Sequence, residues 1–249
     1  MELRDKVVVV TGAGSGIGAA LVERFGQESP RVVVGVDLRG ADRTVDVTDA
    51  EAVAALVHDV ETEHGPIDLY CSNAGIATGL GVDAPEEVWR RTWDVNVMGT
   101  VNAARALLPS VRARGEGYLL VTASAAGLLT NLGDAPYSAT KHAAVGLAEW
   151  LAITHGDDGL KVSCLCPQGV RTPMLMGGID AGEESAKVVE LMGIVEPSLV
   201  ADVVVDGLRD ERFLILPHPE VAEYQVNKAT SPDRWIGGMR KLQRRLTGG

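Results

Sequence analysis

The segment that most constrains the fold of this chain is residues 6–18, where a short apolar run leads directly into a glycine-rich turn. Val7 to Val10 have the unbroken apolar pattern of a strand that is buried on both faces of a parallel sheet. A helical pattern runs from Ala19 to Phe25, after four alternating glycines, Gly12, Gly14, Gly16 and Gly18. Glycines let a backbone approach a ligand closely and a helix N-terminus presents unpaired N–H groups, so this arrangement indicates a phosphate-binding turn. The alternative is an ordinary glycine-rich connection.

The composition indicates one large globular α/β domain and argues against several other classes of protein. The chain has 249 residues, of which 46% are hydrophobic. Its net charge of -11 argues against a general nucleic-acid binder. No stretch approaches the roughly 18 unbroken apolar residues of a membrane span, and the charged residues 1–6 do not resemble a signal peptide. We therefore expect a cytoplasmic protein with neither a membrane nor a nucleic-acid partner.

The three cysteines predict neither a disulfide framework nor a metal site. An odd and sparse count is typical of a reducing compartment. Cys164 and Cys166 lie in an apolar run, which favours a buried strand over metal ligation, and no further cluster of ligands supports a metal.

A carboxylate at the end of the second predicted strand, residues 32–36, indicates which dinucleotide the turn would hold. Asp37 follows the glycines by about 20 residues, the spacing at which a carboxylate accepts hydrogen bonds from an adenosine ribose. It would repel a 2′-phosphate, which favours NAD over NADP. Arg39 and Arg43 would reverse that preference if they folded inward, and a solvated carboxylate at a strand end is the structural alternative.

The connection that follows the second strand is too short to contain a helix. The third strand is expected near residues 43–47, whereas a crossover with its helix needs at least about 10–12 residues. A short loop must therefore replace the helix. Thr48 or Asp49 is then expected to cap a helix over residues 50–64.

Two polar features follow the strand predicted over residues 67–72. Asn73 begins the sequence Asn-Ala-Gly at the carboxyl end of that strand, where open α/β sheets bind ligands. Asn96 lies among valines in a helix expected from Pro85 to about Leu108. Because buried amides need hydrogen-bond partners, Asn96 is either a structural tie or part of a polar relay.

A hydroxyl and a phenol–ammonium pair follow the strand predicted over residues 118–122. Ser124 lies in the small-residue turn after that strand. Tyr137 and Lys141 are four residues apart and share one face of the next predicted helix. An ammonium near a phenol lowers the pKa of the phenol, which can then exchange a proton with an alcohol or a carbonyl near neutral pH. The pair is a weak signal alone and gains weight beside Ser124 and the glycine turn.

The segment after the sixth predicted strand, residues 160–166, is a candidate lid. Residues 174–196 are rich in glycine and in methionine, whose flexible thioether adapts to varied apolar ligands. A solvated connector with a short helix over residues 183–192 is the alternative.

The remaining residues predict a helix over 199–208, a seventh strand over 213–216 and an amphipathic tail over 218–249. We expect the tail to pack on the body or on a neighbouring subunit, in preference to a membrane or a nucleic acid.

These motifs together resemble those of the short-chain dehydrogenase/reductase family over residues 4–217. The glycine turn matches the cofactor turn of the family, and Asn73, Ala74 and Gly75 match a signature after its fourth strand. The catalytic tetrad of the family is matched in order by Asn96, Ser124, Tyr137 and Lys141. Each motif is weak alone, but the ordered set is highly specific.

The resemblance implies a Rossmann-type, doubly wound, seven-stranded parallel sheet with helices on both faces, in a single domain over residues 1–249. It implies that Tyr137 acts as acid or base and that Ser124 holds the substrate oxygen. Lys141 would bind the nicotinamide ribose and tune Tyr137, and Asn96 would hold a relay water. Further cofactor contacts are implied at Ser15, Gly16, Ile17, Asp46, Val47, Pro167, Val170 and Thr172. Members of the family are usually homodimers or homotetramers.

The chain departs from the family pattern in two places. Gln168 replaces the glycine that follows Pro167, with Gly169 one place later, which alters the loop beside the implied nicotinamide site of Val170 and Thr172. The short connection over residues 38–45 removes a helix from one face of the sheet.

The leading hypothesis is an NAD-dependent oxidoreductase that acts on a secondary alcohol or ketone. The alternatives are an NADP-dependent carbonyl reductase and a catalytically idle NAD-binding regulatory protein. The motifs do not specify the substrate, although apolar surroundings favour a hydrophobic or cyclic one. Besides Ser124 and Tyr137, the predicted substrate contacts are Leu132, Asp134, Gln168 and Met174.

Overall fold

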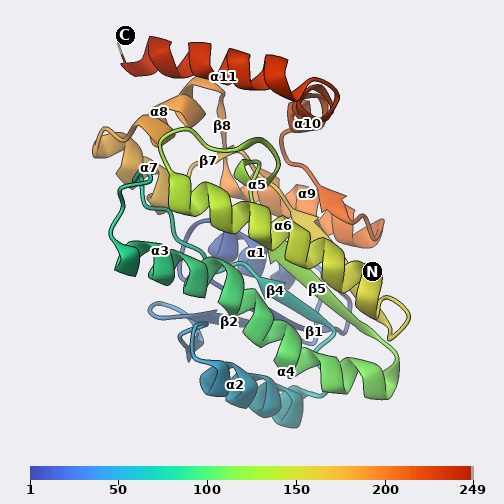
Figure 1. Ribbon diagram of the computed structural model, residues 1–249. Helices are drawn as coiled ribbons and strands as arrows, with labels where there is room; N and C mark the ends of the chain where they lie inside the picture. The colour runs from blue at the N-terminus through green and yellow to red at the C-terminus, as the bar shows by residue number, and fades with distance from the viewer. Residues whose placement is uncertain (248–249) are drawn as a thin grey trace.

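The chain is built on a parallel sheet of seven strands, in the order β3-β2-β1-β4-β5-β6-β9. The computed structural model describes residues 1–247, so the last two residues of the predicted tail lie outside it (Figure 1). The strands are β1 (Val7–Thr11), β2 (Val32–Asp37), β3 (Arg43–Thr44), β4 (Leu69–Ser72), β5 (Gly117–Thr122), β6 (Leu160–Leu165) and β9 (Leu214–Ile215). The predicted Rossmann-type fold in a single domain is confirmed.

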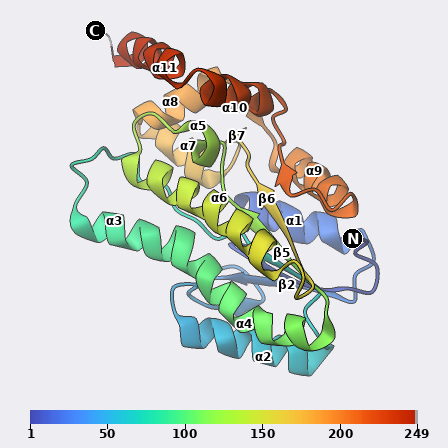
Figure 2. The same ribbon diagram turned by 45° about the vertical axis from the view of Figure 1, so that its right-hand side comes forward.

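Helices cover both faces of this sheet (Figures 1 and 2). One face packs against α2 (Ala50–His64), α4 (Gly99–Arg114) and α6 (Ala135–His155), and the other against α1 (Gly16–Gly26) and α9 (Pro197–Arg209). Val7 and Val9 point into the first layer, and Val8 and Val10 point into the second. All four are at most 1% exposed, which explains why β1 is an unbroken apolar run.

The connection after β2 contains no helix, as the sequence predicted. Residues 38–42 form a loop, which Asp42 holds by accepting a hydrogen bond from the Gly35 N–H group (2.8 Å). β3 is shorter than the predicted strand because Asp46 accepts a hydrogen bond from the Thr48 N–H group and turns the chain (2.9 Å). Asp49 then caps α2, whose bounds are those that the sequence predicted.

The predicted helix from Pro85 to about Leu108 is interrupted. It consists of α3 (Glu86–Trp93), a π-helical turn η1 (Asp94–Met98) and α4, which continues to Arg114. Asn96 lies in the π-helical turn. Such turns are frequent at functional sites.

The segment predicted as a lid or as a connector leaves the main sheet and returns to it. β7 (Gly169–Val170) and β8 (Ile194–Val195) pair at its two ends, and α7 (Pro173–Asp180) and α8 (Glu184–Leu191) lie between them. The tail forms α10 (Glu220–Thr230) and α11 (Pro232–Thr247). Val221 of α10 is fully buried in the core, so the tail packs on the body of its own chain. The small helix α5 (Ala126–Leu129) follows β5.

Replacing Leu120 with alanine will lower the free energy of unfolding by about 2–5 kcal/mol, because the change removes buried methyl groups and leaves a cavity. Leu120 is fully buried in β5, on the face that α1 and α9 cover. Urea denaturation followed by circular dichroism measures the change. Val82, which is 77% exposed, provides a control, since Val82→Ala is expected to shift the value by less than about 0.5 kcal/mol. Equal effects of the two changes would contradict the assigned core.

Candidate active site

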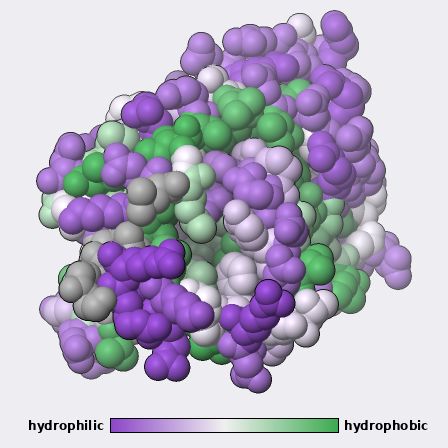
Figure 3. Space-filling model, turned by 90° about the horizontal axis from the view of Figure 1, so that it is seen from above, coloured by the Kyte–Doolittle hydropathy of each residue, from purple (hydrophilic) through white to green (hydrophobic). Residues whose placement is uncertain are grey.

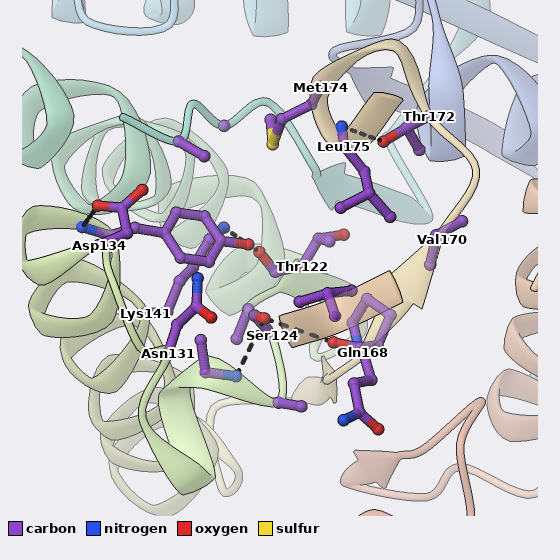
Figure 4. Close-up of a pocket in the computed structure, with 18 of the residues that line it drawn as sticks. Thr122, Ser124, Asn131, Asp134, Lys141, Gln168, Val170, Thr172, Met174 and Leu175 are labelled. Carbon is purple, nitrogen blue, oxygen red and sulfur yellow. Dashed lines mark hydrogen bonds between the residues drawn. The ribbon is translucent and has the colours of Figure 1, made fainter. Parts of the chain in front are cut away.

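A continuous cavity of about 830 Å³ lies at the carboxyl ends of the strands. All of the predicted cofactor and substrate contacts except Gly18 line this cavity. Of the predicted tetrad, Ser124, Tyr137 and Lys141 line the cavity, and Asn96 does not. Figure 4 shows Lys141, Asp134 and Asn131 on one side of the cavity, and Val170 and Thr172 on another. Among residues 1–247, no group of three or more His, Cys, Asp or Glu side chains is placed to hold a metal ion. No helix in the same range is long and apolar enough to cross a membrane.

The glycine turn packs so closely on its neighbours that a side chain would not fit at two of its positions. Gly12 has a φ of +68°, and a Cβ atom there would lie 2.9 Å from the Cα atom of Ala74. A Cβ atom at Gly18 would overlap the carbonyl oxygen of Gly12, so Gly18 lets α1 pack directly on the turn. No side chain caps α1 at Ser15, whereas Asp49 caps α2. The first N–H groups of α1 are therefore left without a side-chain acceptor, as an anion-binding turn requires.

Asp37 lies beside this turn at the end of β2. Its Oδ2 atom accepts a hydrogen bond from the Gly14 N–H group (3.0 Å), and its Oδ1 atom accepts one from Leu38 (2.6 Å). The carboxylate therefore lies beside the glycine turn, and its contact with an adenosine ribose stays a prediction. Arg43, which would favour a 2′-phosphate if it folded inward, is instead paired with Glu63 of α2 (2.6 Å).

The turn after β3 contributes Asp46 and Val47 to the same end of the cavity. Burial alone would raise the pKa of Asp46. Hydrogen bonds from Thr48 and the charge of Arg91 have the larger combined effect, so the pKa of Asp46 is lower than its usual value. The carbonyl oxygen of Val47 accepts a hydrogen bond from the Asn102 amide of α4 (3.0 Å). These contacts fix the turn although the connection before it has no helix.

The ends of β1 and β4 are joined by hydrogen bonds around Thr11. Its Oγ1 atom donates to the Cys71 carbonyl (3.1 Å) and accepts from the N–H groups of Asn73 (3.0 Å) and Ala74 (3.1 Å). The Asn73 amide donates to the Thr11 carbonyl oxygen (3.0 Å). Asn73 therefore fixes the floor of the crevice between the two strands.

Asn96 is a structural tie, which is one of the two alternatives that the sequence left open. Its Oδ1 atom accepts from the Ile76 N–H group (2.9 Å), and its Nδ2 atom donates to the Ile76 carbonyl (2.9 Å) and to Thr140 Oγ1 (3.0 Å). The side chain is 4% exposed. It joins the π-helical turn to α6 and to the loop after β4, behind the cavity wall. Its implied role in holding a relay water stays a prediction.

Tyr137, Lys141 and Ser124 meet at the cavity. Tyr137 and Lys141 lie one turn apart on α6, with the Lys141 Nζ atom 5.4 Å from the centroid of the phenol ring. Nζ donates a hydrogen bond to the Thr122 carbonyl at the end of β5 (3.0 Å). Ser124 Oγ accepts a hydrogen bond from the Ala126 N–H group (3.1 Å), which fixes the turn (Figure 4). The end of β5 therefore positions the Lys141 ammonium and Ser124, and α6 carries both Lys141 and the Tyr137 phenol.

The ionisation of the phenol differs from the sequence prediction. Burial raises the pKa of Tyr137; a hydrogen bond with Ser124 lowers it, and the charge of Asp134 raises it further. Burial also lowers the pKa of Lys141 to about 8. The predicted lowering of the Tyr137 pKa by Lys141 is therefore wrong, because the same burial disfavours both the phenolate and the ammonium.

Asp134 anchors the start of α6 and also lines the cavity, and its predicted contact with substrate stays a prediction. Its carboxylate accepts hydrogen bonds from the N–H group (2.7 Å) and the hydroxyl (2.7 Å) of Thr78, and from the N–H groups of Gly79 (2.8 Å) and Tyr137 (3.0 Å). The residue is 1% exposed. Asp134 thus fixes the backbone of Tyr137 against the loop after β4. The N-cap position before a helical pattern was the sequence signal for this role.

His218 was missed by the sequence analysis and holds the unusual loop after β6. Its Nδ1 atom accepts a hydrogen bond from the Gln168 N–H group (3.1 Å), and its Nε2 atom donates to the Gly169 carbonyl (3.1 Å). Burial lowers the pKa of His218, which favours the neutral ring that this pattern requires. The Gln168 amide donates to Met192 Sδ (2.8 Å). No motif marks His218, because its partners lie about 50 residues earlier in the chain.

The end of this loop contacts the glycine turn. Thr172 caps α7 by accepting a hydrogen bond from the Leu175 N–H group (3.3 Å). A Cβ atom at Gly16 would lie 3.0 Å from Thr172 Cγ2. Val170 and Thr172 therefore reach the cavity despite the shifted glycine.

Comparison with known proteins gives consistent matches. The family model described as "short chain dehydrogenase" matches residues 42–181. The chain is 34% identical to 1-deoxy-11-beta-hydroxypentalenate dehydrogenase of Streptomyces exfoliatus, over 81% of this chain and 82% of the relative. It is also 34% identical to meso-2,3-butanediol dehydrogenase of Serratia marcescens, over 71% of this chain and 76% of the relative. A crystal structure of a short-chain dehydrogenase/reductase from Burkholderia phymatum in complex with NAD matches with a TM-score of 0.84 and 26% identity, covering 94% of this chain and 96% of the other.

Replacing Lys141 with methionine removes a buried charge at nearly constant side-chain length and will change the pH dependence of the free energy of unfolding. Burial lowers the Lys141 pKa from 10.5 to about 8, so between these pH values the unfolded chain binds this proton more tightly than the folded chain. The wild-type free energy of unfolding will therefore rise relative to that of the variant, by up to roughly 1.4 kcal/mol per pH unit. Below about pH 8 the difference is constant. Urea titrations of both proteins across the interval measure it, and a flat difference would contradict the burial of a charged Lys141.

Proposed function

This chain belongs to the short-chain dehydrogenase/reductase family of oxidoreductases, and we propose that it transfers a hydride between NAD(H) and a secondary alcohol or ketone. The observation that carries the proposal is that one cavity is lined both by the predicted cofactor residues and by the predicted acid–base residues. Asp37 and the uncapped start of α1 lie at one end, and Tyr137, Ser124 and Lys141 lie at the other.

The residues at the first end fit a dinucleotide. Gly12 and Gly18 let β1, the turn and α1 pack closely together, and the first N–H groups of α1 have no side-chain cap at Ser15. Asp37 would accept hydrogen bonds from the adenosine ribose. NAD is preferred over NADP because this carboxylate repels a 2′-phosphate and Arg43 is paired with Glu63. The Burkholderia phymatum relative, in complex with NAD, supports the same choice.

When bound, NAD would accept a hydride from the carbinol carbon of the substrate at its nicotinamide ring. In that direction the hydroxyl proton of the alcohol goes to Tyr137 and then to solvent, which leaves the ketone. Ser124 holds the substrate oxygen, and Lys141 holds the nicotinamide ribose. Pro167, Val170 and Thr172 would contact the nicotinamide ring and its amide.

The raised pKa of Tyr137 sets the pH dependence of the two directions. At neutral pH the phenol is protonated, which is the form that donates to a ketone oxygen. Oxidation of an alcohol needs the phenolate, so its rate will increase toward alkaline pH.

The lid over residues 174–196 belongs to this proposal. Met174 of α7 and Val188 and Met192 of the α8 region line the cavity, and paired β7 and β8 hold both ends of the segment. These side chains would cover an apolar substrate. A homodimer or homotetramer and a cytoplasmic location stay predictions.

Replacing Tyr137 with phenylalanine will reduce kcat for alcohol oxidation by roughly 100-fold to 10,000-fold, because the acid–base group is lost. The affinity for NADH will change little, since the ring remains in place. Absorbance of NADH measures the first quantity and fluorescence titration the second. Tyr118→Phe is the control, because Tyr118 is hydrogen-bonded to Ser163 (2.8 Å) and does not line the cavity. Equal losses of turnover and NADH affinity in Tyr137→Phe would contradict its assigned role.

Replacing Asp37 with alanine will weaken NADH binding by about tenfold to 100-fold and strengthen NADPH binding, because a ribose acceptor and a repulsive charge are both removed. Fluorescence titration with each cofactor measures both changes. Asp59→Ala makes the same charge change on the exposed surface of α2 and will leave both affinities near wild type. Tighter binding of NADPH than NADH by the wild type would favour the NADP-dependent alternative.

A further inference from the structure

The two C-terminal helices form a wall of the cavity. α10 and α11 follow residue 217, where the sequence resemblance ends, and they lie outside the family match over residues 42–181. α11 lies beside α8 in both ribbon views (Figures 1 and 2). Residues of both tail helices line the same cavity as Tyr137. The tail therefore shapes the substrate end of the site.

The wall that α11 contributes is largely apolar. Trp235, Met239 and Leu242 share one face of the helix and line the cavity. The indole ring of Trp235 lies 6.3 Å from the ring of Tyr224 in α10, measured between centroids. α8 adds Val188 to the lining. Figure 3 shows hydrophobic surface between hydrophilic surfaces on the face seen from above. This end of the cavity suits the apolar body of a ligand.

Most charged groups of the cavity already have partners. Lys141 donates to the Thr122 carbonyl, and the oxygens of Asp134 accept four hydrogen bonds. At the adenosine end, Arg91 is paired with Asp46 (3.5 Å). Asp134 and Arg91 are thus already engaged, and Lys141 is the group that the proposed function assigns to the nicotinamide ribose.

Two charged side chains remain at the lid and the tail. The Glu183 carboxylate is packed so closely between the lid and the loop after β4 that a Cβ atom at Gly79 would overlap it. The side chain of Arg234, on the first turn of α11, is exposed at the cavity and forms no hydrogen bond or ion pair with the side chains that the structure describes. Among the described residues that line the cavity, it is therefore a cation that a substrate can reach at this end.

We infer that the substrate is a secondary alcohol or ketone with an apolar body and a carboxylate group, and that Arg234 pairs with this carboxylate. The inference deepens the proposed function and rests on it. The planar guanidinium binds a carboxylate through two parallel hydrogen bonds. One arginine balances one negative charge, which favours a carboxylate over a phosphate dianion. The chain carries a net charge of -11, so an anionic substrate needs such a local cation to enter.

The test compares hydroxy acids of graded chain length, from hexanoate to dodecanoate, with their primary amides. Each carries a secondary hydroxyl on the carbon next to the terminal methyl group. With NAD and the wild-type enzyme, kcat/KM for the preferred acid will exceed that for its amide by roughly tenfold or more. R234Q will lower this ratio at least about tenfold, mainly by raising KM for the acid, and R234K will retain part of it.

R240Q is the matched control. Arg240 lies on the same helix, is exposed and does not line the cavity, so this variant makes the same charge change and will keep the wild-type ratio. A wild-type ratio near one for every chain length would overturn the inference, as would an equal loss in R240Q and R234Q. Oxidation of the amides without a preference for the acids leaves the proposed function intact. If neither series nor a panel of neutral secondary alcohols is oxidised, the proposed function fails and the inference fails with it.

Discussion

The burial of the central strands on both faces is the constraint from which the rest of the structure follows. Val7 to Val10 alternate between two helical layers and are nearly inaccessible to solvent. Because helices cover both faces, polar groups of the inner strands can meet a ligand only where the strands end. Thr11, Asp37 and Asn73 lie at those ends. The position of the cavity is therefore a consequence of how the core is formed.

The same burial determines the chemistry of the site. It raises the pKa of the Tyr137 phenol and lowers the pKa of the Lys141 ammonium, so both groups favour their neutral forms more than they would in water. The buried carboxylate of Asp134 is satisfied because four donors meet its two oxygens. Its hydrogen bond to the Tyr137 backbone joins the stability of α6 to the placement of the phenol. The stability of α6 and the proposed catalysis thus both depend on this hydrogen bond between Asp134 and the Tyr137 backbone.

The end of the cavity proposed to bind substrate is assembled from segments that are distant in sequence. The loop after β6 is held by His218, which lies just beyond β9. The end of the lid contacts that loop because β8 pairs with β7. The helix α11 lies against α8 of the lid. The apolar wall at Trp235 is therefore built by the tail and the lid together.

The sequence by itself determined the sheet, the short connection after β2, the bounds of α2 and the residues that gather at the cavity, because these depend on local periodicity and on motif spacing. Tertiary structure decided the hydrogen-bond partners of Asn96, which are Ile76 and Thr140, and those of His218. It also reversed the predicted pKa shift of Tyr137. Hydrogen-bond partners and burial arise from contacts between distant segments, and a pattern of residue types along the chain does not contain them.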